Sequence, residues 1–291
     1  MLLALAPFAR TDGVPSSKAA ALSAARAAVG RPSVLLFRPH SPGNIGSVAR
    51  AMLNFGLTDL RVVAPADAGW RGHAEAVTNA CGASPLLEDA SLYDAPEAAT
   101  DDLQLVLATT ARTRDAAVPV YTAREAAALA CDAAARGARV GLLFGTEKNG
   151  LSNDELQCAH ALVTIPTEPN FSSLNLAQAV LLVASEWHAA DAAAAGAADA
   201  DAADADAADD DDDAATLQQL RSLLDFSEAQ MWRTGFFGSG GGAGADAADE
   251  AERVRAAASF DKLRRWLLRS RPSAAEASLL RGALQRLAEP R

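Results

Sequence analysis

Short apolar runs alternate with amphipathic stretches between residues 32 and 188, and this alternation restricts the possible folds more than any other feature of the sequence. The runs have the length of buried strands, whereas the stretches place apolar residues every three or four positions, as helices do. Strict alternation of strands and helices predicts an α/β fold with a parallel sheet. The predicted strands cover 33–37, 60–63, 103–109, 139–145 and 161–166, and the predicted helices cover 44–55, 70–80, 122–136, 152–160 and 175–188.

The flanking segments have a different composition. Residues 1–31 are rich in Ala and Ser, with four basic residues and one acidic residue, which is typical of an organellar transit peptide and equally of a flexible N-terminus. Residues 189–215 are rich in Asp and Ala and predict a disordered linker, because such a segment buries too little apolar surface to fold. Residues 216–291 predict a helical, basic extension with a glycine-rich break at 238–245.

The formal net charge of -11 is unevenly distributed. Ten aspartates and no basic residue lie in 189–215, so the rest of the chain carries only -1. Residues 251–291 contain ten Lys and Arg against four Asp and Glu, a local charge of +6 that suits a polyanionic partner. No run approaches the roughly 18 apolar residues that a membrane span requires, so we expect a soluble protein without a membrane partner.

Cysteine usage gives no sign of a metal centre. The three cysteines, Cys81, Cys131 and Cys158, include no CxxC pair, and one of them stays unpaired under any disulfide scheme. This pattern disfavours both a secreted disulfide framework and a zinc site. We therefore expect no metal ligands.

The segment 39–50 follows the first predicted strand and opens a helix. Asn44 is a suitable N-cap, and Arg50 lies off the buried stripe, near the helix start. Such an arginine is either a solvated side chain or a ligand for phosphate or an oxyanion, and the sequence leaves both interpretations open. Gly43 and Gly46 lack the middle glycine of the dinucleotide-binding fingerprint, which disfavours a Rossmann domain.

Two further polar segments follow later strands. Gly145 and Gly150 permit a tight turn and close backbone approach to a ligand, although an ordinary strand-to-helix loop would also explain them. Ser172, Ser173 and Asn175 gather where a helix begins, where they would cap it, hold a polar ligand or do both. Each segment taken alone is ambiguous.

Together, in this order and spacing, the three segments resemble the signature motifs of the SPOUT superfamily, specifically its SpoU/TrmH branch of RNA 2′-O-ribose methyltransferases. The resemblance covers residues 33–188. It resumes at 219–236 and 262–282, in segments peculiar to the TrmJ-like tRNA methyltransferases of that branch.

The resemblance implies a parallel-sheet SPOUT domain over 32–188 with a C-terminal trefoil knot, a homodimer, and S-adenosylmethionine bound among the knotted loops. It implies Arg50 as the catalytic arginine. The other motif positions that we assign to catalysis are Asn44, Glu147, Ser173 and Asn175. The predicted cofactor-binding residues are Thr109, Thr110, Ala111, Gly145, Ile165, Ser172, Ser173 and Leu174.

The implied reaction methylates a ribose 2′-oxygen in tRNA, with anticodon-loop position 32 as the implied target. Arginine, with a pKa above about 12, is a poor general base. We therefore interpret Arg50 as the group that positions the adjacent phosphate and stabilises alkoxide charge, with a general-base role as the alternative. The predicted RNA-binding residues are Arg112, Arg114, Lys262, Arg264, Arg265 and Arg269, although the last four lie in a helix-like segment that packing alone would also explain.

Other functions remain as alternatives. A ribosomal RNA 2′-O-methyltransferase of the same family would carry the same three motifs, and so would a catalytically inactive RNA-binding protein, although the intact motif residues favour an enzyme. A serine hydrolase is disfavoured because the chain has no GxSxG sequence. We expect a cytoplasmic location, or a chloroplast or mitochondrial one if residues 1–31 are a transit peptide.

Overall fold

The computed structural model describes residues 30–111, 118–200, 214–237 and 250–288. Among them, seven strands form one sheet in the order β3-β2-β1-β6-β4-β7-β5, and every neighbouring pair is parallel. The strands are β1 (Ser33–Phe37), β2 (Leu60–Val63), β3 (Ser91–Tyr93), β4 (Leu105–Thr109), β5 (Val120–Thr122), β6 (Val140–Phe144) and β7 (Ala161–Thr164). The predicted α/β fold with a parallel sheet is confirmed.

The strand order brings distant motif segments to one edge of the sheet. β6 lies between β1 and β4, with Phe144 opposite Leu36 and Leu143 opposite Ala108. β7 pairs with the other side of β4, where Val163 is opposite Thr109. Because all these strands run in the same direction, the loops that follow β1, β4, β6 and β7 leave the same edge.

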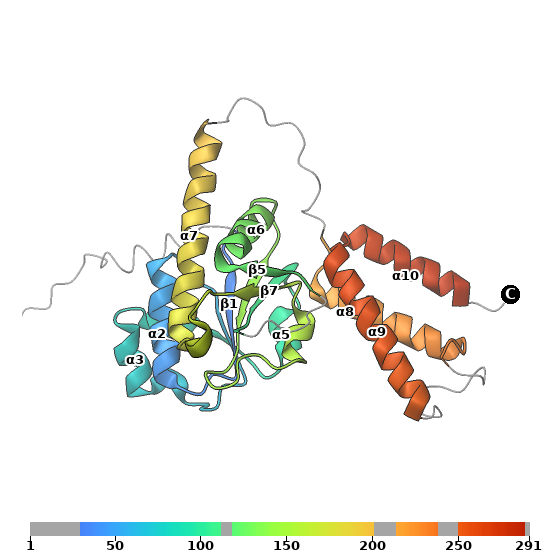
Figure 1. The fold of residues 1–291 in the computed structure, drawn as a ribbon, viewed down its shortest axis with the longest axis horizontal. Coiled ribbons are helices and arrows are strands. Elements are labelled where there is room, and N and C mark those ends of the chain that lie inside the picture. Colours follow the sequence, from blue (N-terminus) through green and yellow to red (C-terminus); the bar gives the residue numbers. More distant parts are fainter. Residues whose placement is uncertain (1–29, 112–117, 201–213, 238–249, 289–291) are drawn as a thin grey trace, which may run out of the picture.

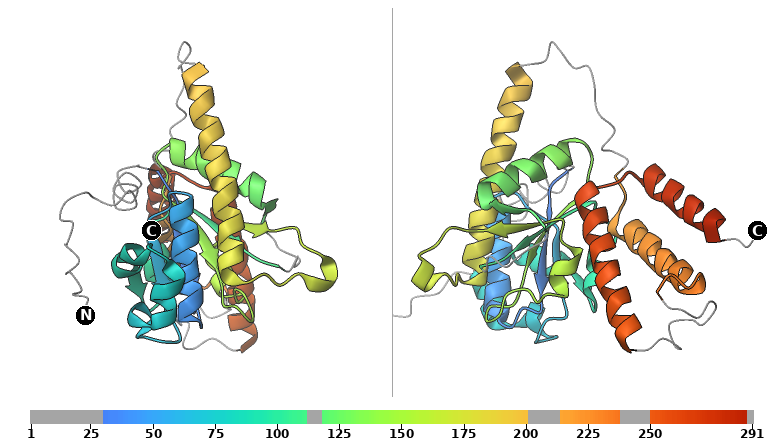
Figure 2. Two further views of the ribbon diagram at one scale, coloured as in Figure 1. Left: turned by 90° about the vertical axis from the view of Figure 1, so that its left-hand side faces the viewer. Right: turned by 45° about the vertical axis from the view of Figure 1, so that its right-hand side comes forward.

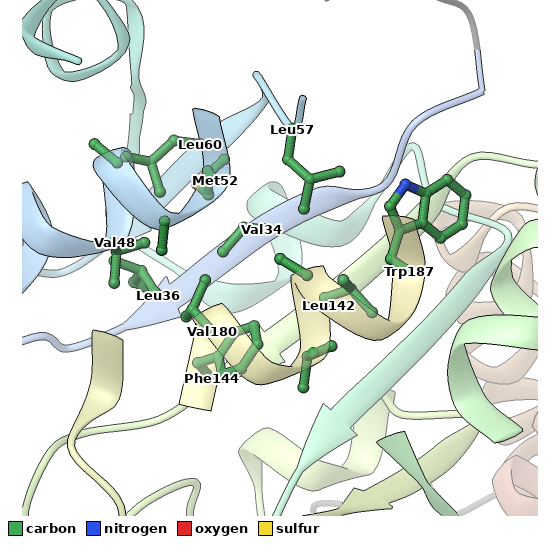
Figure 3. Packing of buried hydrophobic residues seen from close by; sticks show 14 of the residues in the cluster. Val34, Leu36, Val48, Met52, Leu57, Leu60, Leu142, Phe144, Val180 and Trp187 are labelled. Carbon is green, nitrogen blue, oxygen red and sulfur yellow. The ribbon is translucent and has the colours of Figure 1, made fainter. Parts of the chain in front are cut away.

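Within the described residues, five helices contribute to the buried cluster on one face of the sheet, and Figure 1 shows α2, α3 and α7 together on that side. They are α2 (Pro42–Asn54), α3 (Ala74–Ala80), α4 (Ser84–Asp89), α6 (Ala123–Ala135) and α7 (Leu176–Ala200). Figure 3 shows how Val48 and Met52 of α2, together with Val180 and Trp187 of α7, pack around Val34 of β1. Their spacing of four positions on α2 and seven on α7 puts the apolar side chains of each helix on one side, as the sequence predicts.

The second face is covered by the C-terminal helices and α5 (Pro96–Thr100). Figure 2 shows α8 (Leu217–Arg233), α9 (Glu250–Ser270) and α10 (Ala274–Ala288) on the opposite side of the sheet from α2 and α7. Leu35 and Phe37, which alternate with Val34 and Leu36 along β1, belong to the same buried cluster as leucines of α8 and α9. The C-terminal extension is therefore part of the main core.

Several elements differ from the prediction. The sequence did not predict β3 and β5, which have three residues each and no apolar run. Residues 152–160, predicted as a helix, contain only a 3-10 helix, η2 (Glu155–Cys158). The helix that was expected to end at residue 188 continues as α7 to Ala200, into the segment predicted to be a disordered linker. Its many alanines favour this extension.

Some predictions fall outside the described residues. These are the possible transit peptide, apart from its last two positions, the Asp-rich part of the linker at 201–213, and the glycine-rich break at 238–245. Within the described ranges, no helix is both long and apolar enough to cross a bilayer. No group of three or more His, Cys, Asp or Glu side chains in those ranges is arranged to hold a metal ion.

Candidate active site

A cavity of about 260 Å³ lies at the edge of the sheet where β4, β6 and β7 end. Its wall contains polar groups from the segments after β4 and β7, and apolar side chains such as Leu151 and Leu176. All eight residues predicted to bind the cofactor line it: Thr109, Thr110, Ala111, Gly145, Ile165, Ser172, Ser173 and Leu174. The second and third segments that resemble the family motifs, at 143–151 and 165–177, thus line one cavity, whereas the first segment contributes no residue to its wall.

Glu147 joins the loop after β6 to the start of α2. Its Oε1 accepts hydrogen bonds from the Asn44 side-chain amide at 2.9 Å and from the Ser41 backbone N–H at 3.0 Å. Its Oε2 accepts one from the His40 backbone N–H at 3.0 Å, and the His40 Nδ1 lies 3.6 Å away. One carboxylate therefore binds two residues of the β1–α2 loop and one residue in the first turn of α2.

Asn44 extends this network to the third motif segment. Its Oδ1 accepts a hydrogen bond from the Asn175 Nδ2 at 3.0 Å, while the Asn175 Oδ1 accepts one from the Ala177 backbone N–H at the start of α7. The predicted N-cap is wrong: Ser41 caps α2, and its hydroxyl accepts from the Asn44 backbone N–H. The Asn44 side chain is consequently available to connect Glu147 and Asn175.

The environment of Glu147 favours its ionised form. Partial burial opposes ionisation, but hydrogen bonds from the Asn44 amide and from the His40 and Ser41 backbone N–H groups outweigh it and hold the pKa of the carboxyl below its usual range. A carboxylate with a lowered pKa and three donors is suited to holding loops in place. It is poorly suited to accepting a proton at neutral pH.

The loop after β6 is closed on itself. Thr146 and Gly150 form a two-way backbone bridge, with N–H to oxygen distances of 3.1 and 2.9 Å. A Cβ atom at Gly145 would lie 2.1 Å from the carbonyl carbon of Gly150 and 2.2 Å from the backbone nitrogen of Leu151. Gly145 must therefore lack a side chain because the backbone of Gly150 and Leu151 occupies that space. The sequence instead suggested that the glycine allows the backbone to approach a ligand.

The cavity has hydrogen-bonding groups that are available for a ligand. Ser172 is partly exposed and Ser173 is exposed, and neither hydroxyl has a hydrogen-bond partner among the residues described. By contrast, the Thr109 hydroxyl donates to the Leu143 carbonyl at 2.9 Å, and the Thr110 N–H donates to the Val163 carbonyl at 2.9 Å. These two contacts hold the end of β4 against β6 and β7.

Two basic side chains, Arg50 and Lys148, belong to the motif segments and could bind a phosphate. Arg50 is exposed on α2, does not line the cavity, and makes no hydrogen bond or ion pair with the described part of the chain. Lys148 lines the cavity and is exposed. Sequence reasoning did not select Lys148, although it lies between Glu147 and Gly150 in the second motif segment.

The predicted RNA-binding residues fall into three groups. Arg112 and Arg114 lie outside the described residues. Arg264 donates to the Gln157 side chain at 2.5 Å and to Asp261, and the Arg265 Nε donates to the Asp261 carbonyl, so both have partners within the protein. Lys262 and Arg269 are exposed on α9.

Comparison with known proteins identifies the family that the sequence motifs resemble. Residues 31–185 match the model of the SpoU rRNA Methylase family. A tRNA (cytidine/uridine-2′-O-)-methyltransferase TrmJ from Pectobacterium atrosepticum is 34% identical over 251 residues, which cover 86% of this chain and 94% of that protein. A tRNA (cytidine/uridine/adenosine-2′-O-)-methyltransferase TrmJ from Pseudomonas aeruginosa is 40% identical over 161 residues, or 54% of this chain and 62% of that protein.

A solved structure agrees with the sequence relatives. The crystal structure of TrmJ from Z. mobilis ZM4 superposes with a TM-score of 0.70 at 34% sequence identity. The match covers 89% of this chain and 100% of that one, so it includes the C-terminal helices as well as the sheet.

Proposed function

Because this chain belongs to the SpoU rRNA methylase family, we propose that it transfers a methyl group from S-adenosylmethionine to the 2′-hydroxyl of a ribose in tRNA. The observation that carries the proposal is that the second and third motif segments line one cavity, while Asn44 of the first segment is hydrogen-bonded to Glu147 of the cavity wall and to Asn175. The chain is an RNA 2′-O-methyltransferase, and S-adenosylmethionine is the cofactor of its family.

The extent of the matches favours tRNA over ribosomal RNA. The family model ends at residue 185, before the C-terminal helices. The tRNA methyltransferase TrmJ of Pectobacterium atrosepticum matches over 86% of this chain and 94% of its own length, which extends beyond that point. Ribosomal RNA remains the alternative, since the family description names it.

The cavity suits a cofactor that is part apolar and part polar. Ile165, Leu174 and Leu176 supply apolar surface for a nucleoside, and the Ser172 and Ser173 hydroxyls supply hydrogen-bonding groups that no described residue uses. When bound there, S-adenosylmethionine supplies an electrophilic methyl group. We assign Thr109, Thr110, Ala111 and Gly145 to the same binding role, because they line the same wall.

The protein's contribution to the reaction is to orient the ribose and stabilise charge. The Glu147–Asn44–Asn175 network fixes the start of α2 relative to the cavity, which holds the reacting groups in register. The Arg50 guanidinium, exposed and without a protein partner in the described ranges, is available to bind the phosphate next to the target ribose and to stabilise the developing alkoxide.

Further features implied by the family resemblance remain predictions. They are the trefoil knot, the homodimer, methylation at anticodon-loop position 32, and the division into 1–31, 32–188, 189–215 and 216–291. Leu181 and Leu182, both exposed on α7, would suit a dimer contact. The relatives described above are bacterial, which favours a cytoplasmic location over an organellar one.

We expect Arg50→Ala to lower the rate of tRNA methylation by about 100-fold or more while leaving the Kd for S-adenosylmethionine within a few-fold of the wild type, because Arg50 does not line the cavity. Transfer of labelled methyl groups to tRNA gives the rate, and calorimetric titration gives the affinity. The matched control is Arg124→Ala, which removes an exposed arginine whose partner among the described residues is Glu186.

Two results would contradict these assignments. If Arg50→Ala kept most of its methylation rate, Arg50 would not have the proposed role. If the wild-type protein methylated ribosomal RNA and left tRNA unmodified, as mapped by 2′-O-methyl sequencing, the ribosomal RNA alternative would replace the tRNA assignment.

A further inference from the structure

Trp266 on α9 is exposed, although its position in an apolar run suggests burial. Its neighbours Leu267 and Leu268 are buried in the cluster on the second face of the sheet. Phe260, six residues before Trp266, is buried in a smaller, separate cluster. Trp266 itself is 45% exposed. The other three tryptophans of the chain, Trp70, Trp187 and Trp232, are all at most 9% exposed, so Trp266 is its single exposed indole.

Two cations lie on the same side of α9 as Trp266. Lys262 is four residues before it and Arg269 three residues after it, which are the spacings of neighbours on a helix surface. Both are exposed, and neither has an ion pair or hydrogen bond with the residues described here. The acidic residue of this stretch, Asp261, is already bound to Arg264 and accepts from the Arg265 side chain through its carbonyl.

This combination matches the chemistry of single-stranded nucleic acid. An exposed aromatic ring stacks on an unpaired base, and cations on either side neutralise the phosphates that flank it. Duplex RNA does not offer such a base, because its bases are already stacked and paired, whereas hairpin loops present unstacked ones.

The position of α9 also connects this surface to the candidate active site. The Arg264 Nη1 donates to Gln157 of η2, and η2 directly follows the loop that carries Glu147 and Gly145. Leu151, at the end of that loop, lines the cavity and belongs to the same buried cluster as Leu267. The helix that carries Trp266 is therefore packed onto the segment that shapes the cavity.

We propose that Trp266, flanked by Lys262 and Arg269, is a stacking platform for an unpaired base in the loop of the RNA substrate. The proposal rests on RNA being the substrate, and it adds a specific contact for a single-stranded loop. Stacking gives affinity for unpaired bases without strong dependence on which base is presented.

The test measures binding of the full-length protein to an RNA hairpin with a seven-nucleotide loop and to a blunt RNA duplex of equal length. We expect Trp266→Ala to weaken hairpin binding by roughly 5- to 150-fold and to leave duplex binding unchanged, while Trp266→Phe retains most of the hairpin affinity. Lys262→Ala and Arg269→Ala should each reduce the log–log salt slope of hairpin binding by about 0.7. Leu279→Ala, which truncates an exposed leucine on α10, is the matched control.

Fluorescence gives a second readout that needs no alanine variant. Because Trp266 is the one exposed indole, the hairpin should quench the part of the emission that acrylamide also quenches, and Trp266→Phe should abolish that part. Unchanged hairpin affinity in Trp266→Ala, equal weakening for hairpin and duplex, or absence of quenching would overturn the proposal. So would a change in oligomeric state, measured by light scattering, with RNA affinity intact.

The same samples separate this inference from the proposed function. Methyl transfer to tRNA by the wild-type protein tests the function independently of Trp266. If the hairpin quenches Trp266 but no methyl group is transferred to tRNA, the platform stands and the tRNA assignment fails. If methylation proceeds at the wild-type rate in Trp266→Ala with unchanged hairpin affinity, the assignment stands and the platform fails.

Discussion

Glu147 connects segments that are far apart in the sequence, because its carboxylate accepts hydrogen bonds from two residues of the β1–α2 loop and from Asn44 in the first turn of α2. These hydrogen bonds lower the pKa of its carboxyl in the folded protein against the opposing effect of burial. A carboxyl whose folded pKa is below its unfolded value, about 4.3, stabilises the fold fully above that pH. This stabilisation is lost as the pH falls through the folded pKa.

We therefore expect Glu147→Gln to lower the free energy of unfolding by about 1–3 kcal/mol at pH 7, the cost of losing hydrogen bonds to a charged acceptor. The difference from the wild type should shrink in acid, starting near the unfolded pKa of about 4.3 and continuing as the pH falls through the lower folded pKa, because Glu147 then becomes protonated in the wild type too. Urea denaturation at several pH values measures both. Glu88→Gln, which changes an exposed glutamate on α4 that has no partner among the described residues, should show neither effect. A difference that stays constant with pH would show that the charge of Glu147 is not responsible.

The positions of individual site residues could be predicted better than their contacts. The eight expected cofactor residues line one cavity because each follows a strand that ends at the same edge. The contacts of the Asn44 side chain were harder to predict. Ser41 and Asn44 are both good N-cap residues, and choosing Asn44 as the cap assigned its side chain to the helix end rather than to Glu147 and Asn175. Pro42 favours the first helical position, which indicates Ser41, and this signal was available in the sequence.

At the scale of elements, the loop at 145–151 needs a glycine at its start for either of two reasons, close approach of a ligand or close approach of its own backbone, and the sequence does not distinguish them. Gly145 could be needed for a ligand or for the chain itself, and the structure shows contact with the backbone of Gly150 and Leu151. A methyl group at Gly145 forces this loop to shift even when no cofactor is bound.

Gly145→Ala should consequently weaken S-adenosylmethionine binding and also lower the melting temperature of the protein without ligand. Calorimetric titration and thermal unfolding measure the two effects. Gly282→Ala serves as the control, because nothing lies within 4 Å of the added Cβ and alanine favours the helix by up to about 1 kcal/mol. If Gly145→Ala lowered cofactor affinity and left the melting temperature unchanged, the glycine would be required by the ligand alone.

Among elements, those with long apolar runs could be predicted and the short ones could not. β1, β2, β4, β6 and β7 each correspond to a predicted strand because their residues are almost entirely buried and apolar. β3 and β5 are short and lie at the two edges of the sheet, so they need no apolar run. Helix α7 was predicted too short because aspartate and alanine were taken together as a sign of disorder.

At the scale of the whole molecule, the segment predicted as a C-terminal extension covers one face of the sheet and shares its buried cluster. The strands are apolar on both sides, which shows that both faces must be covered. The sequence does not show which distant segment covers the second face. The covering depends on contacts between residues far apart in the chain, such as Gln157 and Arg264, which are 107 positions apart. Deleting residues 251–291 would therefore remove the RNA-binding candidates and part of the core together.

Point variants in the C-terminal helices separate these two roles. Leu267 is buried in one cluster with Leu35 and Phe37 of β1, so Leu267→Ala should lower the free energy of unfolding of the whole chain by about 2–5 kcal/mol. Leu287→Ala, at an exposed position on α10, should change it by less than about 0.5 kcal/mol. Because the cluster is shared, the C-terminal helices and the sheet should unfold in one transition, with coincident curves from circular dichroism and from tryptophan emission. Two separate transitions, with Leu267→Ala affecting only the helical one, would show that the extension is a domain of its own, stable apart from the sheet.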